Sequence, residues 1–160
     1  MLFRSLKIKV FNKKQLAEMK MEALLGVNKG SRNEPYMIVV EYRGDPSSKK
    51  TMGIVGKGIT FDSGGLSLKP SSAMESMKCD MSGAASVLGA IDAIAKLGLK
   101  TNVTAIVPTT DNMTGGGAQC VGDVVRASNG KTIEILNTDA EGRLILSDAL
   151  SWAVKQGIEP

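Results

Sequence analysis

The first part of the chain alternates apolar and polar residues. Apolar side chains at every second position predict a strand over residues 6–11. Asn12 then suits the N-cap of a helix, and apolar residues such as Leu16 and Leu24 predict that one helix runs through residues 13–25. A strand followed directly by a helix is therefore the first predicted unit.

Two short apolar runs follow, at residues 36–42 and 52–55. Both contain several β-branched residues, and a turn-forming Gly-Asp-Pro-Ser-Ser segment separates them, so we expect two neighbouring strands. The next segment, residues 56–79, has four glycines, one proline and no sustained periodicity. Because it lies between well-defined elements, we expect an ordered loop with a functional role.

The clearest helix is predicted at residues 82–97, where apolar residues recur at helical spacing and small residues allow close packing. Gly98 is placed as its C-terminal cap. A buried strand is predicted at residues 102–107, and Pro108 is expected to end it.

A second loop is predicted at residues 109–123, followed by a hairpin with its turn at residues 128–130 and a last helix at residues 139–156. Strands and helices thus alternate, and no internal repeat or domain linker interrupts them. This order predicts an α/β fold in three layers, with a mixed sheet flanked by helices.

Composition narrows the class of protein. The chain has 160 residues, of which 42% are hydrophobic and 22% charged, and its mean hydropathy is 0.00. These values are typical of a soluble globular domain and exclude a disordered or collagen-like chain. No apolar run approaches the length of about 18 residues that a membrane-spanning helix needs. The N-terminal segment lacks the features of a signal peptide, so we expect a cytoplasmic protein with no membrane contact.

Charge and cysteine content add two further expectations. Twenty basic and sixteen acidic side chains give a net charge of +4, which permits an anionic partner. Aromatic residues make up only 4% of the chain, so it has no stacking platform for single strands, and nucleic-acid binding is the weaker alternative. Cys79 and Cys120 lack metal-binding spacing and the chain has no histidine, so we expect reduced, structural thiols.

Four acidic residues stand where predicted elements give way to loops: Asp62, Asp80, Asp139 and Glu141. In an open α/β sheet such loops form the binding crevice, so we expect these carboxylates to converge. Without histidine the donor set consists of hard oxygen ligands, which suits magnesium, manganese, or zinc in an oxygen-rich site. Four negative charges are balanced by two divalent ions, which favours a two-metal site.

Each of these residues also has a simpler role. Asp80 suits a helix N-cap, residues 138–141 fit the capping-box pattern, and Asp62 suits a turn. Three basic residues would ordinarily be solvated surface charges: Lys57, Lys69 and Arg143. A phosphate-binding loop motif is not present, and a serine or cysteine nucleophile with a histidine base is excluded because the chain has no histidine.

Three runs of sequence carry a resemblance when they are taken together: VGKGITFDSGGLSLK at 55–69, MKCDMSGAA at 77–85 and NTDAEGRLILSDAL at 137–150. In this order and spacing they closely resemble the leucyl aminopeptidase family of two-metal exopeptidases. The likeness begins near Leu6 and covers nearly the whole chain. It implies that residues 1–160 are part of a catalytic domain whose second half, like the family's separate N-terminal domain, lies outside the chain.

The resemblance also implies an activity: hydrolysis of N-terminal residues of the leucine type from peptides, by a cytosolic homohexamer with two manganese or zinc ions. It implies five metal ligands: Lys57, Asp62, Asp80, Asp139 and Glu141. Of these, Asp62 and Glu141 would bridge both ions, Asp80 would bind the first ion and Asp139 the second. Lys69 would polarise the scissile carbonyl, and Arg143 would hold a bicarbonate that acts as general base for the bridging water.

Two alternatives and one departure remain. The family usually has a proline-bearing loop that bears on substrate access, but residues 113–122 read MTGGGAQCVG and contain no proline, so this loop departs from the family pattern. A catalytically inactive piece that serves only assembly or binding is one rival, which the presence of Lys57, Lys69 and Arg143 disfavours. A two-metal phosphoesterase is the other, and the lack of histidine disfavours it.

Overall fold

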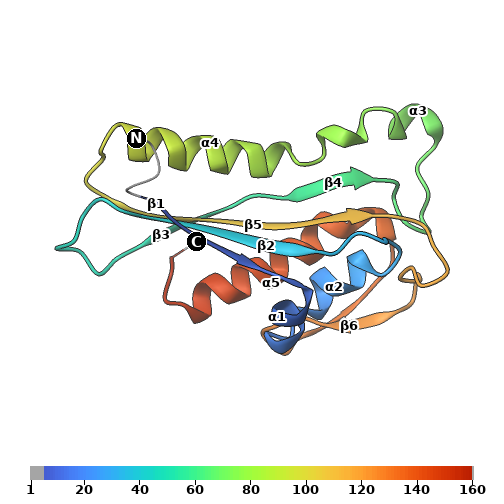
Figure 1. Ribbon diagram of the computed structural model, residues 1–160. Helices are drawn as coiled ribbons and strands as arrows, with labels where there is room; N and C mark the ends of the chain where they lie inside the picture. The colour runs from blue at the N-terminus through green and yellow to red at the C-terminus, as the bar shows by residue number, and fades with distance from the viewer. Residues whose placement is uncertain (1–5, 160) are drawn as a thin grey trace.

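The computed structural model describes residues 6–159, which are arranged in three layers (Figure 1). The strands are β1 (Leu6–Phe11), β2 (Tyr36–Arg43), β3 (Met52–Val55), β4 (Gly58–Asp62), β5 (Asn102–Asn112), β6 (Val124–Arg126) and β7 (Thr132–Glu134). The α-helices are α1 (Lys13–Glu18), α2 (Glu22–Asn28), α3 (Ser71–Met74), α4 (Ser82–Lys96) and α5 (Glu141–Lys155), and two short 3₁₀ helices are η1 (Met77–Cys79) and η2 (Thr138–Ala140).

A mixed five-stranded sheet forms the middle layer. Its order is β1-β2-β5-β3, and β4 pairs with β5 on the same side as β3. The contacts of β2 with β1 and β5 are antiparallel, whereas β3 and β4 run parallel to β5. Helix α4 covers one face of the sheet, and α1, α2 and α5 cover the other (Figure 1). The predicted α/β class, with a mixed sheet flanked by helices, is confirmed.

Strand β5 occupies the centre of the sheet, which corrects two predictions. We expected β2 and β3 to be neighbours, but β5 lies between them. It is the longest strand and is buried along almost its whole length, so it takes the position with strands on both sides. We also expected Pro108 to end the strand, but β5 continues to Asn112. Val55 pairs with Ile106 and Gly58 with Thr109, so Pro108 lies opposite the break between β3 and β4, where no strand partner needs its missing N–H.

The helix predicted at residues 13–25 is in fact two helices. Asn12 caps α1 as expected, through a capping box with Gln15. The chain then turns at Lys20, which has a left-handed φ of 58°, and resumes as α2. The turn redirects the second helix so that Met21 and Leu24 are both completely buried.

The segment predicted as a loop, residues 56–79, contains β4, α3 and η1. Strand β4 escaped prediction because only Ile59 and Phe61 are apolar, which is too few to form an alternating pattern. Its pairing with β5 also shifts register between Ile59 and Asp62. The remaining elements follow the prediction: α4 spans most of residues 82–97, β6 and β7 form the hairpin, and η2 followed by α5 covers the last predicted helix.

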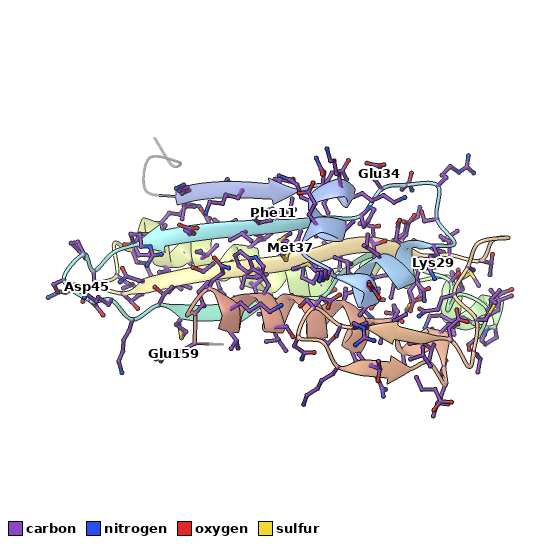
Figure 2. All side chains as sticks on the ribbon, turned by 90° about the horizontal axis from the view of Figure 1, so that it is seen from below. Phe11, Lys29, Glu34, Met37, Asp45 and Glu159 are labelled. Atoms are coloured by element: carbon purple, nitrogen blue, oxygen red, sulfur yellow. The ribbon has the colours of Figure 1, made fainter. Side chains whose placement is uncertain are left out.

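The main core lies between the sheet and the helices α2 and α5, on the face seen from below in Figure 2. Met37 of β2 is completely buried there, and the ring of Phe11 meets that of Trp152 edge to face, with centroids 5.9 Å apart. A second cluster, which includes Ile91 of α4 and Val103 of β5, fills the opposite face. Each face of the sheet therefore has its own apolar core.

Two simpler expectations can be compared with the structure. Over residues 6–159 no helix is both long enough and apolar enough to cross a membrane. Cys79 and Cys120 are free thiols, as expected, but both are exposed, so the prediction that they are structural is wrong.

Asp148 of α5 ties this helix to α2 and to the turn after β6. It is completely buried, and its carboxylate accepts hydrogen bonds from the backbone N–H groups of Leu24 at 3.0 Å and Ser128 at 2.7 Å. Burial raises the pKa of Asp148, although these N–H donors oppose the shift. We expect Asp148→Ala to lower the free energy of unfolding by about 2–4 kcal/mol, because two buried N–H groups lose their acceptor. Urea denaturation measures this loss.

The control for that prediction is Asp92→Ala. Asp92 forms an exposed ion pair with Lys96 one helical turn away in α4, and such pairs contribute little. We expect this variant to stay within about 0.5 kcal/mol of the wild type. An equal loss in both variants would mean that Asp148 has no special role in the core.

Candidate metal centre

The candidate acids come from three separate segments that meet at one end of the sheet, where strands β4 and β5 end. Asp62 ends β4, Asp80 directly follows η1, and Asp139 and Glu141 lie where η2 passes into α5. In Figure 1 the arrows of β4 and β5 end on the side where α5 begins. Carboxylate oxygens of Asp62, Asp139 and Glu141 all lie within 4.8 Å of one another. The structure therefore brings these residues together at the carboxyl ends of parallel strands, where α/β folds place their sites.

Lys57 joins two of these acids. Its Nζ atom lies 2.6 Å from Glu141 Oε1 and 2.8 Å from Asp80 Oδ2. Its backbone carbonyl accepts a hydrogen bond from the N–H of Ala84, which fixes the β3–β4 connection to the first turn of α4. Burial lowers the pKa of Lys57, but the hydrogen bonds and charges of Asp80 and Glu141 outweigh it, and the net pKa is raised. Lys57 is thus a counter-charge inside the acid cluster.

Lys69 joins the other two acids. Its Nζ atom lies 2.7 Å from Asp139 Oδ1 and 3.2 Å from Asp62 Oδ2. The hydrogen bond to Asp139 is the main cause that raises the pKa of Lys69, Asp62 adds to it, and burial opposes it. The backbone N–H of Lys69 donates to the carbonyl of Ser63, which closes the loop after β4. Each lysine thus joins two of the four acids, and the two pairs are brought together by the short distances between Asp62, Asp139 and Glu141.

Glu141 is the most buried member of the cluster, with 1% of its surface exposed. Desolvation raises its pKa, the charge of Asp62 adds to the shift, and Lys57 opposes it. Its Oε2 atom has no hydrogen-bond partner and no ion pair among residues 6–159. A buried carboxylate oxygen without a donor is costly, so this position suits a cation.

The donor set fits divalent metal ions. Four carboxylates carry four negative charges and the two lysines offset two of them, which leaves an excess of two negative charges in a largely buried cluster. Carboxylate oxygens are hard ligands, and a neutral lysine amine can add a nitrogen donor. The donor atoms of this cluster therefore suit divalent cations, and Asp62, Asp139 and Glu141 form its closest group.

A hydrogen-bond network that the sequence analysis did not predict connects the segments that bear the cluster. Asn112, the last residue of β5, donates from Nδ2 to Asp62 Oδ1 at 2.8 Å and to the carbonyl of Thr138 at 3.0 Å. The Thr138 hydroxyl donates to the carbonyl of Gly64 and accepts from the N–H of Ser67. The loop after β4 is thus fastened to the turn that begins α5. The sequence carried no signal for this network, because Asn112 fell in the loop predicted at residues 109–123 and only the structure shows that it ends β5.

Arg143 is placed differently from the other candidates. Its side chain is exposed, and it has no ion pair within the described part of the chain. It lines a separate hollow of about 260 Å³, together with Asn137 and Ala140 of the same turn. The structure therefore leaves Arg143 beside the cluster but out of contact with its acids.

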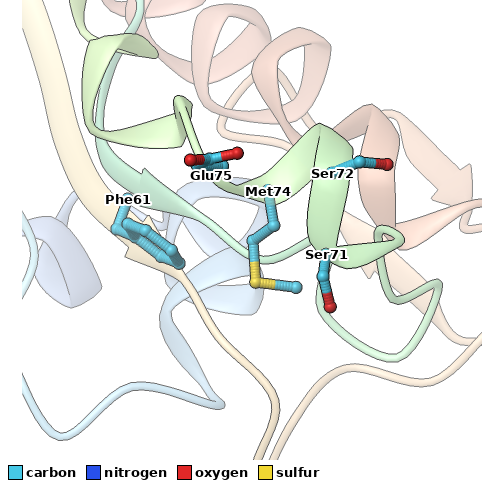
Figure 3. A pocket seen from close by; sticks show the side chains of 5 residues that line it. All are labelled: Phe61, Ser71, Ser72, Met74 and Glu75. Atoms are coloured by element: carbon cyan, nitrogen blue, oxygen red, sulfur yellow. The ribbon is translucent and has the colours of Figure 1, made fainter.

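Two neighbouring features lie outside the cluster. A more open groove of about 510 Å³ lies between β4 and α3 and contains none of the four acids (Figure 3). Its lining residues are Phe61, Ser71, Ser72, Met74 and Glu75. The loop after β5 packs on Gly30, where a Cβ atom would lie 1.9 Å from the carbonyl oxygen of Met113. Only glycine fits at this close approach.

Comparison with known proteins gives a consistent result. The family model for the catalytic domain of the cytosol aminopeptidase family matches residues 2–160. The chain is 54% identical over 149 residues to a protein of Chlorobaculum tepidum, 56% over 147 to one of Ralstonia nicotianae and 51% over 152 to one of Alkaliphilus oremlandii, each named "Probable cytosol aminopeptidase". These alignments cover 93%, 92% and 95% of this chain and 30%, 29% and 30% of the relatives. The chain thus spans about 30% of the length of the curated relatives it matches.

Proposed function

Because the chain belongs to the cytosol aminopeptidase family, we propose that it supplies the metal-binding part of an aminopeptidase that releases N-terminal residues, with a preference for the leucine type, from peptides. The observation that carries this proposal is the cluster of four carboxylates, in which Lys57 and Lys69 each pair with two and three lie within 4.8 Å of one another. Residues 1–160 would then be part of a larger catalytic domain. The whole enzyme would be a cytoplasmic homohexamer, as the resemblance implies.

We assign two divalent ions, manganese or zinc, to the cluster. The ligands would be Lys57, Asp62, Asp80, Asp139 and Glu141. Asp62 and Glu141 are the central pair, because each is nearly completely buried and their carboxylates lie close enough to be shared. The excess negative charge of the cluster supports a bound cation. Two divalent ions match the charge of the four carboxylates when Lys57 binds as a neutral amine, and nearby positive ions favour that form because they lower the pKa of a lysine.

When bound, two adjacent divalent ions supply an activated water and polarise a carbonyl oxygen. Lys69 pairs with Asp139 and Asp62, and as an ammonium it can donate a hydrogen bond to the substrate carbonyl as that oxygen becomes negative. Arg143 lies in the first turn of α5, where free backbone N–H groups and the guanidinium favour an anion such as bicarbonate, the general base that the resemblance implies.

Titration of manganese into the metal-free protein by isothermal calorimetry tests the proposal. We expect two ions per chain, and we expect Asp62→Asn to lower the affinity at least about 10-fold because it removes a charge from the centre of the cluster. The matched control is Asp92→Asn on exposed α4, which should bind as the wild type does. Absence of binding by the wild type would favour the inactive assembly piece, and would overturn the metal centre.

A glycine in the first turn of α5 gives a second prediction. A Cβ atom on Gly142 would lie 2.9 Å from Lys57 Cδ and 3.3 Å from its Nζ, so Gly142→Ala must displace the lysine. We expect manganese affinity to fall about 10-fold. Stability without metal should stay the same or rise by up to about 1 kcal/mol, because alanine favours a helix over glycine.

Gly89→Ala is the control for this substitution. Gly89 lies within α4, and nothing lies within 4 Å of a Cβ built there. This variant should gain similar helix stability and keep its manganese affinity. If Gly142→Ala binds manganese as tightly as Gly89→Ala, the position of Lys57 does not matter for metal binding.

A further inference from the structure

Asn112 sits at the junction of two segments that hold the acid cluster. It is 4% exposed, and it ends β5 directly beside Asp62 in the sheet, with which it is paired in register. Its backbone carbonyl accepts hydrogen bonds from both the N–H and the hydroxyl of Ser63, at 2.9 and 2.8 Å. The backbone of Asn112 therefore already holds the loop after β4, independently of its side chain.

The side-chain amide of Asn112 then connects two different segments. One contact of Nδ2 is with Asp62 Oδ1 at 2.8 Å, and the other is with the backbone carbonyl of Thr138 at 3.0 Å. Asp62 Oδ1 also accepts from the N–H of Gly64 at 2.9 Å. Because Oδ1 is held by these two donors, Oδ2 is the oxygen that lies toward Lys69, at 3.2 Å. The rotation of the Asp62 carboxylate is thus set by Asn112 and Gly64.

We propose that Asn112 is a positioning residue of the metal centre, whose carboxamide orients Asp62 and holds the turn at Thr138 at a fixed distance from it. This inference rests on the proposed function, because it concerns the same cluster. Among the acids of the cluster, Asn112 donates a hydrogen bond only to Asp62. Its second hydrogen bond is to Thr138, at the turn that leads into α5 and bears Asp139 and Glu141. Asn112 would therefore act on the metal centre through these two contacts.

The chemistry of the position requires an amide. Only a carboxamide of this length offers two N–H donors to two acceptors in different segments. An aspartate would offer none and would place a second carboxylate against Asp62 Oδ1. Gly65 in the loop after β4 leaves space for this amide, because a Cβ atom at that position would lie only 3.0 Å from Asn112 Oδ1.

A purely structural role is the competing explanation, and the chain contains a matched control for it. Asn28 is also an almost completely buried asparagine, at 3% exposed. Its Nδ2 likewise donates two hydrogen bonds, to the carbonyl of Asn33 at 2.7 Å and to the Thr110 hydroxyl at 3.1 Å. It contacts none of the four acids. Removal of either amide should therefore cost similar stability, but only Asn112 should affect the metals.

The experiment compares Asn112→Ala and Asn28→Ala with the wild type. Free manganese is followed by electron paramagnetic resonance during titration of each metal-free protein, and urea denaturation in the presence of a chelator measures stability without metal. We expect the urea midpoint of both variants to fall by a similar amount. We expect the manganese dissociation constant to rise about 10- to 100-fold in Asn112→Ala, and to change less than about 2-fold in Asn28→Ala.

The outcomes separate this inference from the proposed function. If the wild type binds no manganese, the metal centre and the role of Asn112 are both overturned. If the wild type binds two ions and Asn112→Ala binds them equally well, the positioning role alone is wrong. Equal losses of affinity in both variants would also overturn it, because the effect would then follow stability. Should Asn112→Ala not fold, Asn112→Ser, which keeps one hydroxyl donor, is measured against Asn28→Ser with the same criteria.

Discussion

Replacement of Lys69 by alanine, in the complete product of its gene, is expected to lower kcat for an N-terminal leucine substrate by about 100-fold or more while both metal ions stay bound. The loss has this size because single donors to a developing oxyanion typically contribute a factor of 10² to 10³. Lys69 contacts Asp62 and Asp139 in the cluster, but as a cation it competes with metal ions for these carboxylates. Its removal should therefore not weaken metal binding.

Steady-state kinetics and metal analysis on the same preparation decide this prediction. Lys96→Ala is a suitable control, because Lys96 forms an exposed ion pair with Asp92 far along α4 and should leave both quantities unchanged. If Lys69→Ala loses both ions together with its activity, Lys69 is needed for assembly of the site. In that case it would have no separate role in the transition state.

The elements that were predicted correctly are those whose pattern is local. Helix α4 is long and has a single repeating apolar pattern, and the β6–β7 hairpin has apolar residues that flank a short turn, with Val125 paired to Ile133. Asn12 was predicted as a cap, and its partner in the structure, Gln15, is only three residues away. In each case the residues that decide the structure lie within one helix or one turn.

The predictions that failed depend on segments far apart in the sequence. Whether β2 and β3 are neighbours is decided by β5, which begins almost fifty residues after β3 ends. Pro108 can lie within a strand only because the break between β3 and β4 falls opposite to it. The turn at Lys20 is favoured because it buries Met21 against other parts of the core. None of these partners is visible in a local pattern.

The candidate site shows the same division. The three sequence motifs were sufficient to select Asp62, Asp80, Asp139 and Glu141, and the structure adds which lysine connects which acids. Asn112 could not be selected, because its value depends on Asp62 and Thr138, which lie 50 and 26 residues away.

Glu141→Gln is expected to weaken manganese binding at least about 100-fold and to leave the metal-free protein no less stable than the wild type. The two effects have one origin, the burial of a negative charge. Changes behind a metal ligand already cost about 10- to 100-fold in affinity, so the loss of the charge of a central ligand should cost no less. Without metal, the same charge has an oxygen with no donor among the described residues, and glutamine removes this cost at almost the same volume.

The pH dependence of stability tests the second effect. The folded-state pKa of Glu141 is raised, mainly by desolvation, so the folded state binds more protons at this residue than the unfolded state does. Stability due to this residue therefore falls as pH rises above its unfolded pKa, and the loss is complete above the folded pKa. Glutamine does not titrate, so the difference in stability between variant and wild type should grow in favour of the variant from pH 4 to pH 8. Lys57 keeps Asp80 as a partner in the variant, so no lysine is left buried without a counter-charge.

Urea denaturation in the presence of a chelator, at several pH values, and manganese titration at pH 7.5 provide the two measurements. Glu134→Gln is the control, because Glu134 is an exposed residue of β7 outside the cluster. A Glu141→Gln protein that is less stable at every pH but binds manganese normally would make Glu141 a structural partner of Lys57. A variant that binds manganese more weakly, and whose stability relative to the wild type increases with pH, would instead show that the charge of Glu141 lowers the stability of the metal-free protein but is needed for metal binding.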